Sequence, residues 1–390
     1  ATDQGKARPH QGELLPDGEP TQGGGTRTGH YLVGNEGIYK VGEFLGEEGF
    51  GQVAKCTKMG CQEFFAIKII DDVESGKKEF EALELIKDLD PVKNNLVKLY
   101  ECFLFENVIC LVYEILGESL LDRMRRQDFV PTHLCKLRPV AQQMFQALSA
   151  LKSISVAHMD IKVDNIMYVD EESSKIKLID FGLAIKTKEM LTGSNIQVIP
   201  FRAPEVILGL PMDESVDMWA LGIVFATMCR GDFPFPCGTE YETIRGLVQT
   251  FGFPDSNPSW RLKTPDEFTR TSGEHVGNVD HVANFDEMTE IHREQFELFD
   301  DDDHRAFNDL LKRMLEVDPI NRITPSQALE HDFITMRHLS GESQASYAGW
   351  LVVVVGLNVL KGGVPMISAA FSVKEKEMCT GFHWELQFFP

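Results

Sequence analysis

The apolar residues between about positions 39 and 113 fall in short runs that are rich in β-branched and aromatic side chains and are broken by glycine or charged turns. The runs 53–56, 64–70 and 108–113 predict strands of a mostly antiparallel sheet. One stretch inside this region, 77–89, instead has apolar residues at spacings of three, which predicts an amphipathic helix.

After Gly117 the pattern becomes helical, as in 134–154 and 216–229. A small sheet lobe with one helix, residues 39–116, therefore precedes a larger and mostly helical lobe, residues 117–338. We predict an α+β fold with two lobes, and their junction is a natural place for a ligand cleft.

Both ends of the chain differ from this central region. Residues 1–38 are rich in Gly, Gln, Pro and Thr and contain no long apolar run, which predicts a flexible leader. At the other end, within a tail of residues 339–390, positions 350–360 are almost wholly apolar. Eleven helical residues reach only about 16 Å against a hydrocarbon core of roughly 30 Å, so we favour a packed strand or an irregular tail over a membrane segment.

The composition fits a globular protein, with 43% hydrophobic and 25% charged residues among 390. Lys and Arg total 38 against 60 Asp and Glu, a net charge of −22. Such a charge repels phosphate backbones and anionic lipid, so we expect basic partners, no direct nucleic-acid binding and no membrane binding. Eight scattered cysteines without a CxxC pair are read as reduced thiols of an intracellular protein.

A glycine-rich stretch lies at residues 45–53, Leu-Gly-Glu-Glu-Gly-Phe-Gly-Gln-Val. Glycines let the backbone approach a phosphate closely and turn its N–H groups toward it. A hairpin turn explains the cluster equally well. A dinucleotide-binding fold would need a helix directly after the glycines, whereas strands are predicted here, so the stretch is interpreted as a flap over a nucleotide.

Lys68 lies within the apolar run Ala-Ile-Lys-Ile-Ile, where an ammonium group is costly to bury without a partner. An edge-strand lysine that points to solvent is the alternative interpretation. We expect its partner to be an acid on the predicted helix. Glu81 is the choice because Leu85, four residues on, continues the inward face, and Glu84 is second.

The residues with the clearest chemistry lie in 158–165, His-Met-Asp-Ile-Lys-Val-Asp-Asn, and in Asp-Phe-Gly at 180–182. Asp160 can accept a hydroxyl proton and Lys162 can neutralise a transferring phosphate. Asn165 and Asp180 can hold Mg²⁺, which completes a phosphoryl-transfer set. His158 is expected to hold this loop rather than to act as an acid or base.

Further on, Ala203-Pro204-Glu205 ends a loop begun at Asp180, and Arg322 is the expected buried counter-charge of Glu205. With these blocks in order, residues 39–338 resemble a eukaryotic protein kinase domain.

Three segments narrow the resemblance. Residues 207–211, 240–245 and 260–266 resemble the homeodomain-interacting protein kinases, relatives of the dual-specificity tyrosine-regulated kinases. The resemblance implies a two-lobed kinase fold with ATP and Mg²⁺ between the lobes, transfer to Ser or Thr, and work in the nucleus or cytoplasm. It implies protein substrates that are basic or contain Ser/Thr-Pro, transcriptional regulators among them, with Arg202 favouring Pro after the acceptor.

The resemblance also assigns site residues. Lys68 would hold the α and β phosphates, paired with Glu81, and Asp160 with Lys162 would carry the transfer. Residues of the glycine-rich flap, the adenine pocket and the connection between the lobes would bind the nucleotide: Leu45, Gly46, Gly49, Gly51, Val53, Ala66, Tyr113 as gatekeeper, Glu114 and Leu116 through their backbones, Met167 and Ile179.

Some positions depart from that family pattern. Glu48 replaces the second flap glycine, and Met159 replaces an Arg that clamps an activation-loop phosphate. Asn195 lies where the family autophosphorylates a Tyr, and Ile199 where it has an Arg. Val198 replaces a Ser or Thr that bridges the catalytic Asp and Lys, a loss of about 1 to 3 kcal/mol. The alternative to a working kinase is therefore a weak or inactive nucleotide-binding pseudokinase that acts as a signalling scaffold.

Overall fold

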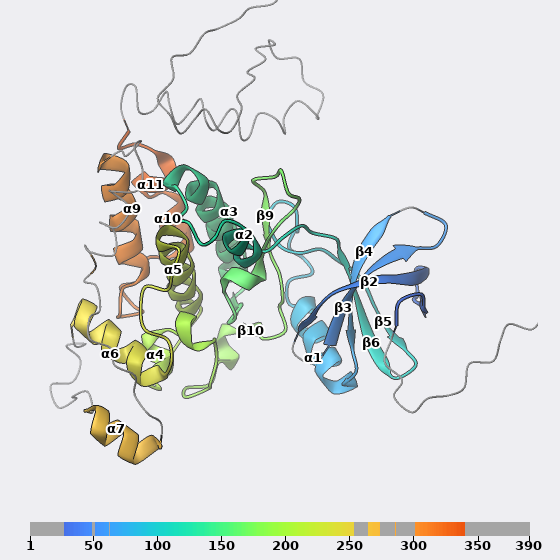
Figure 1. The fold of residues 1–390 in the computed structure, drawn as a ribbon, viewed down its shortest axis with the longest axis horizontal. Helices are drawn as coiled ribbons and strands as arrows, with labels where there is room; N and C mark the ends of the chain where they lie inside the picture. Colours follow the sequence, from blue (N-terminus) through green and yellow to red (C-terminus); the bar gives the residue numbers. More distant parts are fainter. Residues whose placement is uncertain are drawn as a thin grey trace, which may run out of the picture.

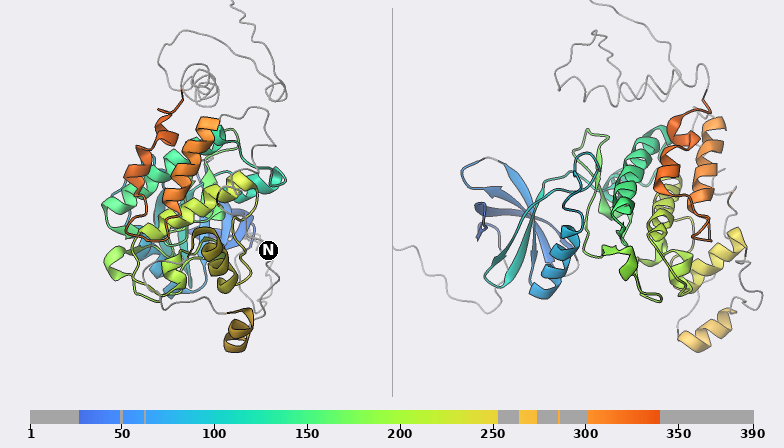
Figure 2. Two further views of the ribbon diagram at one scale, coloured as in Figure 1. Left: turned by 90° about the vertical axis from the view of Figure 1, so that its left-hand side faces the viewer. Right: turned by 180° about the vertical axis from the view of Figure 1, so that it is seen from behind.

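The computed structural model describes residues 27–48, 51–61, 63–252, 264–273, 285 and 301–339. They form two lobes side by side along the long axis of the molecule (Figure 1). The first lobe is a curled sheet with one helix, and the second is mostly helical, as the view from behind also shows (Figure 2). The predicted α+β fold with two lobes is confirmed.

The sheet of the first lobe has six antiparallel strands in the order β1-β2-β3-β4-β6-β5. Its strands are β1 (Tyr31–Val33), β2 (Ile38–Glu48), β3 (Gly51–Lys58), β4 (Phe64–Ile70), β5 (Leu99–Phe105) and β6 (Val108–Glu114). The sheet begins before the expected boundary at residue 39, because Leu32 in β1 is buried opposite Tyr39. Residues 1–26 of the expected leader lie outside the described residues.

Helix α1 (Val73–Glu84) begins four residues before the predicted helix and ends earlier than predicted. Its N-cap is Asp72, whose side chain accepts the N–H of Ser75 at 3.1 Å. Gly76 in the first turn lies against β6, where a Cβ would come within 2.6 Å of Ile109. Only a residue without a side chain permits this close approach. The contact of Gly76 with β6 therefore sets which face of the helix is buried.

Apolar side chains cover both faces of the sheet, which explains the nearly continuous apolar runs of β4 and β6. One face curls around a small core that includes Tyr39, Phe65 and Phe103. The rings of Tyr39 and Phe103 are stacked with centroids 6.1 Å apart. The other face joins α1 and the second lobe in one large core, so the sheet and the helical lobe share a buried boundary.

The second lobe is built around α5, whose residues are buried on nearly every side, as expected of a helix at the centre of a domain. The predicted helices 134–154 and 216–229 correspond to α3 and α5. The helices are α2 (Leu120–Arg126), α3 (Leu134–Ser153), α4 (Pro204–Ile207), α5 (Ser215–Arg230), α6 (Glu240–Phe251), α7 (Pro265–Ser272), α9 (Asp301–Met314), α10 (Pro325–Leu329) and α11 (Asp332–Thr335).

Short strands shape the side of the second lobe that faces the sheet. They form the pairs β8 (Ile166–Tyr168) with β9 (Ile176–Leu178) and β7 (Val156–Ala157) with β10 (Ile185–Lys186). Three turns of 3₁₀ helix, Val163–Asn165, Thr187–Glu189 and Ile199–Phe201, lie between or after them. In the part of the chain that the structure describes, no helix is both long enough and apolar enough to span a bilayer. The apolar stretch 350–360 lies outside the described residues.

Candidate active site

Lys68 pairs with an acid on α1, but that acid is Glu79. The ammonium nitrogen of Lys68 lies 2.9 Å from Glu79 Oε1 and 3.6 Å from Asp180 Oδ1. Glu81, the predicted partner, and Glu84, the second choice, are both exposed. The prediction of Glu81 is therefore wrong, and the solvent-facing edge-strand alternative for Lys68 is wrong as well.

The correction follows from the phase of the helix. Gly76, Glu79, Ala82 and Leu83 form the buried face, at spacings of three and four from the glycine that touches β6. The prediction instead took Leu85 as the guide to the inward face, although Leu85 is only half-buried. A glycine in the first turn followed three residues later by Glu was the signal that could have identified the right acid.

The sheet register brings the predicted nucleotide-binding residues of the first lobe onto one face. Gly46 pairs with Val53, and Val53 pairs with Lys68. Because opposite residues share a face and residues two apart repeat it, Ala66 and Tyr113, which pair with each other, lie on that same face. It is the face that carries Lys68 toward α1 and the second lobe. Gly49 lies outside the described residues.

The remaining predicted nucleotide-binding residues lie in β2, at the start of β3, at and after the end of β6, and in the second lobe. Leu45 is half-exposed in β2, and Gly51 opens β3. Glu114 ends β6 and Leu116 follows it, partly buried against the large core. From the second lobe, Met167 lies in β8, and the N–H of Ile179 bonds to a carbonyl of the neighbouring loop.

Asp160 is nearly buried and receives two hydrogen bonds on one oxygen. Lys162 Nζ lies 2.7 Å from Asp160 Oδ2, and Asn165 Nδ2 donates to the same oxygen at 2.8 Å. Asn165 Nδ2 also donates to the carbonyl of Asp160, which closes the loop on itself. The three residues that were predicted to act together are therefore in direct contact.

The side chains of His158 and Asp217 hold the loop that contains Asp160 through hydrogen bonds to its backbone. His158 Nδ1 accepts the N–H of Asp160 at 3.2 Å, so Nε2 carries the proton that it donates to the carbonyl of Ile179 at 2.9 Å. Both ring nitrogens are hydrogen-bonded, which agrees with the interpretation of His158 as a residue that holds the loop. The buried carboxylate of Asp217 accepts the N–H groups of His158 and Met159 at 2.7 and 2.8 Å, and Met159 has a positive φ of 70°.

Asp180 brings the second acidic group to the site. Its φ of 57° is unusual for a residue other than glycine, and its Oδ1 accepts the N–H of Gly182 at 3.3 Å. Burial acts to lower the pKa of Lys162, but the bond to Asp160 and the charges of Asp160, Asp180 and Asp164 outweigh it and raise that pKa. Lys162 is therefore held as a cation among the acids of the site.

The oxygen atoms present suit Mg²⁺, which prefers carboxylate and amide oxygens and keeps places for phosphate and water. Asn165 uses its amide nitrogen toward Asp160, so its oxygen is the atom available to a cation. Asp180 supplies a carboxylate. Within the described residues no group of three or more His, Cys, Asp or Glu side chains forms a metal site.

A strained residue lies in the segment between Asp180 and α4. Gln197 is buried and has a φ of 61°. Arg202 donates from Nη2 to the carbonyl of Gln197 at 2.6 Å and from Nε to the same carbonyl at 3.1 Å, and its Nη1 pairs with Glu240 of α6. The side chain of Gln197 accepts the N–H of Ala203 and donates to a carbonyl of α5. These two bonds and the two from Arg202 hold its unusual backbone conformation in place.

The predicted pair of Glu205 and Arg322 is confirmed. Arg322 donates from Nη1 and Nη2 to the two oxygens of Glu205 at 2.6 and 2.9 Å, and both side chains are fully buried. The guanidinium also lies over the ring of Trp219 at 5.3 Å. This bidentate pair ties α4 to the segment before α10 and does not reach the residues around Asp160.

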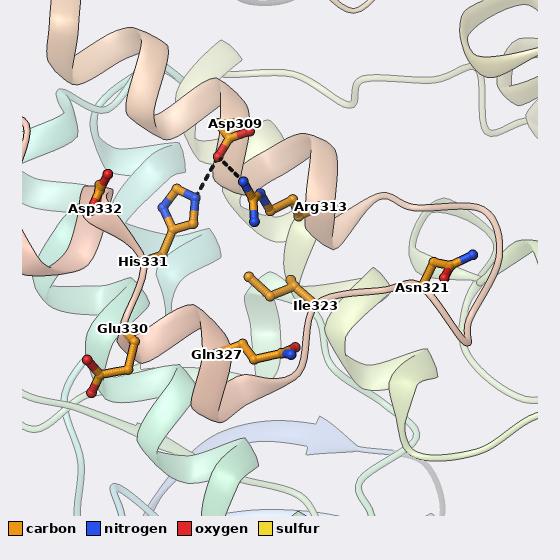
Figure 3. Close-up of a pocket in the computed structure, with 8 residues that line it drawn as sticks. All are labelled: Asp309, Arg313, Asn321, Ile323, Gln327, Glu330, His331 and Asp332. Atoms are coloured by element: carbon orange, nitrogen blue, oxygen red, sulfur yellow. Dashed lines mark hydrogen bonds and ion pairs between the residues drawn. The ribbon is translucent and has the colours of Figure 1, made fainter.

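A separate cavity of about 490 Å³ lies between α9 and the segment containing α10 and α11 (Figure 3). Among the acids that line it, Asp309 is bonded to His331 at 2.8 Å and to Arg313 at 3.0 Å. The bonds to His331 and Arg313 and their charges outweigh partial burial and lower the pKa of Asp309. These groups satisfy one another, and the cavity contains none of the predicted site residues.

Comparisons with known proteins agree with the geometry. The family model described as protein kinase domain matches residues 39–334. The chain is 38% identical over 335 residues to homeodomain-interacting protein kinase 2 of Mesocricetus auratus, and the aligned region covers 77% of this chain and 29% of that protein. Homeodomain-interacting protein kinase 1 of Caenorhabditis elegans is 35% identical over 350 residues, covering 79% and 41%.

A more distant relative is dual specificity protein kinase YAK1 of Saccharomyces cerevisiae, 29% identical over 349 residues that cover 78% of this chain and 43% of that protein. The chain thus spans less than half the length of each of these three relatives.

Proposed function

Because the chain belongs to the protein kinase domain family, we propose that it transfers the γ-phosphate of ATP to the hydroxyl groups of Ser and Thr in proteins. The observation that supports this most is the direct contact of Asp160 with Lys162 and Asn165. These are the residues that phosphoryl transfer needs beside the phosphate.

Asp160 is the proposed base. Among the described residues, the bonds from Lys162 and Asn165 both end on Oδ2 of Asp160. Its Oδ1 is therefore the oxygen that would accept the hydrogen bond of a substrate hydroxyl. The hydroxyl oxygen forms a bond to the γ-phosphorus while its proton passes to Asp160. The bond between the γ-phosphorus and the bridging oxygen breaks, and ADP leaves with that oxygen.

Cationic groups on either side would offset the charge of the transferring phosphate. Lys162 lies beside Asp160, and Lys68 is held by Glu79 within 3.6 Å of Asp180. Asn165 and Asp180 would hold Mg²⁺, which when bound neutralises charge on the phosphate oxygens. Preorganised cations of this kind are among the largest contributions to catalysis.

Gln197 and Arg202 support a preference for Pro after the acceptor. The left-handed backbone of Gln197 and the two bonds from Arg202 turn its carbonyl toward Arg202. The N–H of the substrate residue directly after the acceptor would then find no hydrogen-bond acceptor at that carbonyl. Leaving such a donor unsatisfied costs free energy. Proline has no N–H and avoids this cost.

The wider biological setting is part of the same proposal. A net charge of −22 favours basic protein substrates. Two of the relatives are named for their interaction with homeodomain proteins, so transcriptional regulators are the proposed substrate class, and the nucleus or cytoplasm is the proposed location. The scaffold alternative gains no support, because Lys68, Asp160, Asn165 and Asp180 all keep the side chains that transfer requires.

The test is transfer of radiolabelled phosphate from ATP to paired peptides that differ only in Ser-Pro against Ser-Ala. We expect the wild-type chain to favour the Ser-Pro peptide and Asp160→Asn to lose roughly 10²- to 10⁴-fold in rate. Asp170→Asn, an exposed acid near the same loop, serves as the matched control and should keep full activity. Equal transfer by Asp160→Asn would remove Asp160 from the mechanism.

A further inference from the structure

A buried ion pair joins the two lobes at a point that the proposed chemistry does not use. Lys177 Nζ lies 2.5 Å from Glu114 Oε1, and the side chains are only 9% and 19% exposed. Glu114 is the last residue of β6 in the first lobe, and Lys177 is the middle residue of β9 in the second lobe. Charges are rarely buried in this way unless they are well paired.

The carboxylate of Glu114 also ties its own lobe together. Its Oε1 accepts the N–H of Lys98 at 2.7 Å, and the N–H of Glu114 donates to the carbonyl of Lys98 at 3.1 Å. Lys98 directly precedes β5. One oxygen atom therefore connects the end of β6, the approach to β5 and, through Lys177, the second lobe.

Strand β9 lies between the sheet and α3 (Figure 1) and is anchored on both sides, to α3 of the second lobe and to the segment before β5 of the first lobe. The N–H of Leu178 donates to the carbonyl of Asn95 at 2.8 Å. Gln143 of α3 accepts both the N–H of Ile176 and the side-chain amide of Asn95, at 2.9 and 3.0 Å. The ammonium of Lys177 thus projects from a strand whose own position is fixed by α3.

Both ends of the pair lead directly into the nucleotide site. Leu116, two residues after Glu114, begins the connection between the lobes, where the adenine edge is proposed to bind. Asp180, three residues after Lys177, is the proposed metal ligand. A change in the distance between Glu114 and Lys177 would alter the offset between these two parts of the site.

We propose that Lys177 and Glu114 are positioning residues that hold the adenine-binding segment after β6 at a fixed offset from Asp180. The ion pair between their side chains sets the affinity for the nucleotide without itself touching it, whereas the proposed contact of Glu114 with the adenine edge is made by its backbone. This inference rests on the proposed function, since it concerns the same nucleotide site. It differs from a purely structural role, in which loss of the pair would reduce stability and leave the nucleotide affinity of the folded protein unchanged.

The experiment compares Lys177→Met, Glu114→Gln and the double variant in the full chain. Because the pair acts on ground-state binding, we expect each single variant to raise KM for ATP about tenfold while kcat stays within roughly threefold. The KM for the peptide should not change. The double variant should be no weaker than either single variant, because the two residues act as one unit.

Matched variants separate this role from general damage. Lys175→Met removes an exposed lysine two residues earlier and should leave KM for ATP unchanged. Lys177→Arg keeps the charge and should recover most of the affinity lost in Lys177→Met. Glu114→Gln preserves the shape of the side chain and decides the question if Lys177→Met does not fold.

A second measurement is independent of turnover: calorimetric titration with ADP in the presence of Mg²⁺. We expect the dissociation constant to rise by the same factor as KM in the single variants. An unchanged constant in folded Glu114→Gln, or effects that multiply in the double variant, would overturn the inference. If the wild type bound ADP but transferred no phosphate, the proposed function would fail while this titration still decided the inference.

Discussion

Two buried acid–base pairs, Lys68 with Glu79 and Arg322 with Glu205, are alike in charge and differ in what surrounds them. Arg322 gives two parallel bonds to Glu205, and both side chains are sealed from solvent at 0% and 1% exposure. Lys68 is about a tenth exposed, and it lies between Glu79 of its own lobe and Asp180 of the other. The pair of Arg322 and Glu205 is closed, and the pair of Lys68 and Glu79 faces the place where the lobes meet.

The difference shows how one type of interaction serves stability in one place and chemistry in another. A planar guanidinium matches a carboxylate in two bonds and stays charged, which suits a permanent connection. An ammonium is a compact point charge that two acids can share and that a phosphate can approach. Variants that remove one partner should therefore affect folding in the Arg322 pair and activity in the Lys68 pair.

The largest effect is expected for Arg322→Met, which leaves Glu205 buried without its partner. Removing one member of a buried pair costs about 3 to 5 kcal/mol in the free energy of unfolding. Urea unfolding followed by circular dichroism measures it. The matched control, Arg125→Met, breaks a pair with Asp122 whose side chains are 60% and 53% exposed, and should cost less than about 1 kcal/mol. Equal losses in the two variants would contradict the comparison.

A smaller effect, on activity, distinguishes the acids of α1. Glu79→Gln keeps the shape of the side chain but removes the charge that holds Lys68, so the rate of transfer should fall about 10- to 100-fold. Glu81→Gln changes an exposed acid two residues away and should leave the rate unaltered. Steady-state kinetics on both variants decides between the two acids, and a loss confined to Glu81→Gln would restore the prediction made from sequence.

The smallest effect is a gain. Val198 is 43% exposed, and the family resemblance implies at this position a hydroxyl that bridges Asp160 and Lys162, the residues proposed to carry the transfer. Val198→Thr restores a hydroxyl with almost the same shape, and we expect kcat to rise up to about tenfold. Val198→Ala adds no hydroxyl and should not raise kcat. An unchanged rate in the Thr variant would show that the missing hydroxyl does not limit this chain.

Several parts of the site could be predicted because their chemistry is local in the chain. Asp160, Lys162 and Asn165 lie within six residues, so one loop brings them into contact whatever the rest of the fold does. The pairing of Arg322 with Glu205 was also predicted, because a buried charge of each sign leaves few choices. Gln197 was missed, since a left-handed backbone in a residue other than glycine has no signature in sequence.

Residue order and polarity were enough to define the two lobes, the family and the cluster of Asp160, Lys162 and Asn165, because these depend on short-range spacing and on which side chains carry charge. The partner of Lys68 and the link between Glu114 and Lys177 depended on packing. The two residues of each pair are separated by 11 and 63 positions in the sequence. Glu79 meets Lys68 because α1 starts after Asp72 and Gly76 contacts β6. Lys177 meets Glu114 because β9 is anchored on α3. Such contacts form only when whole elements pack together, so periodicity within one element cannot specify them.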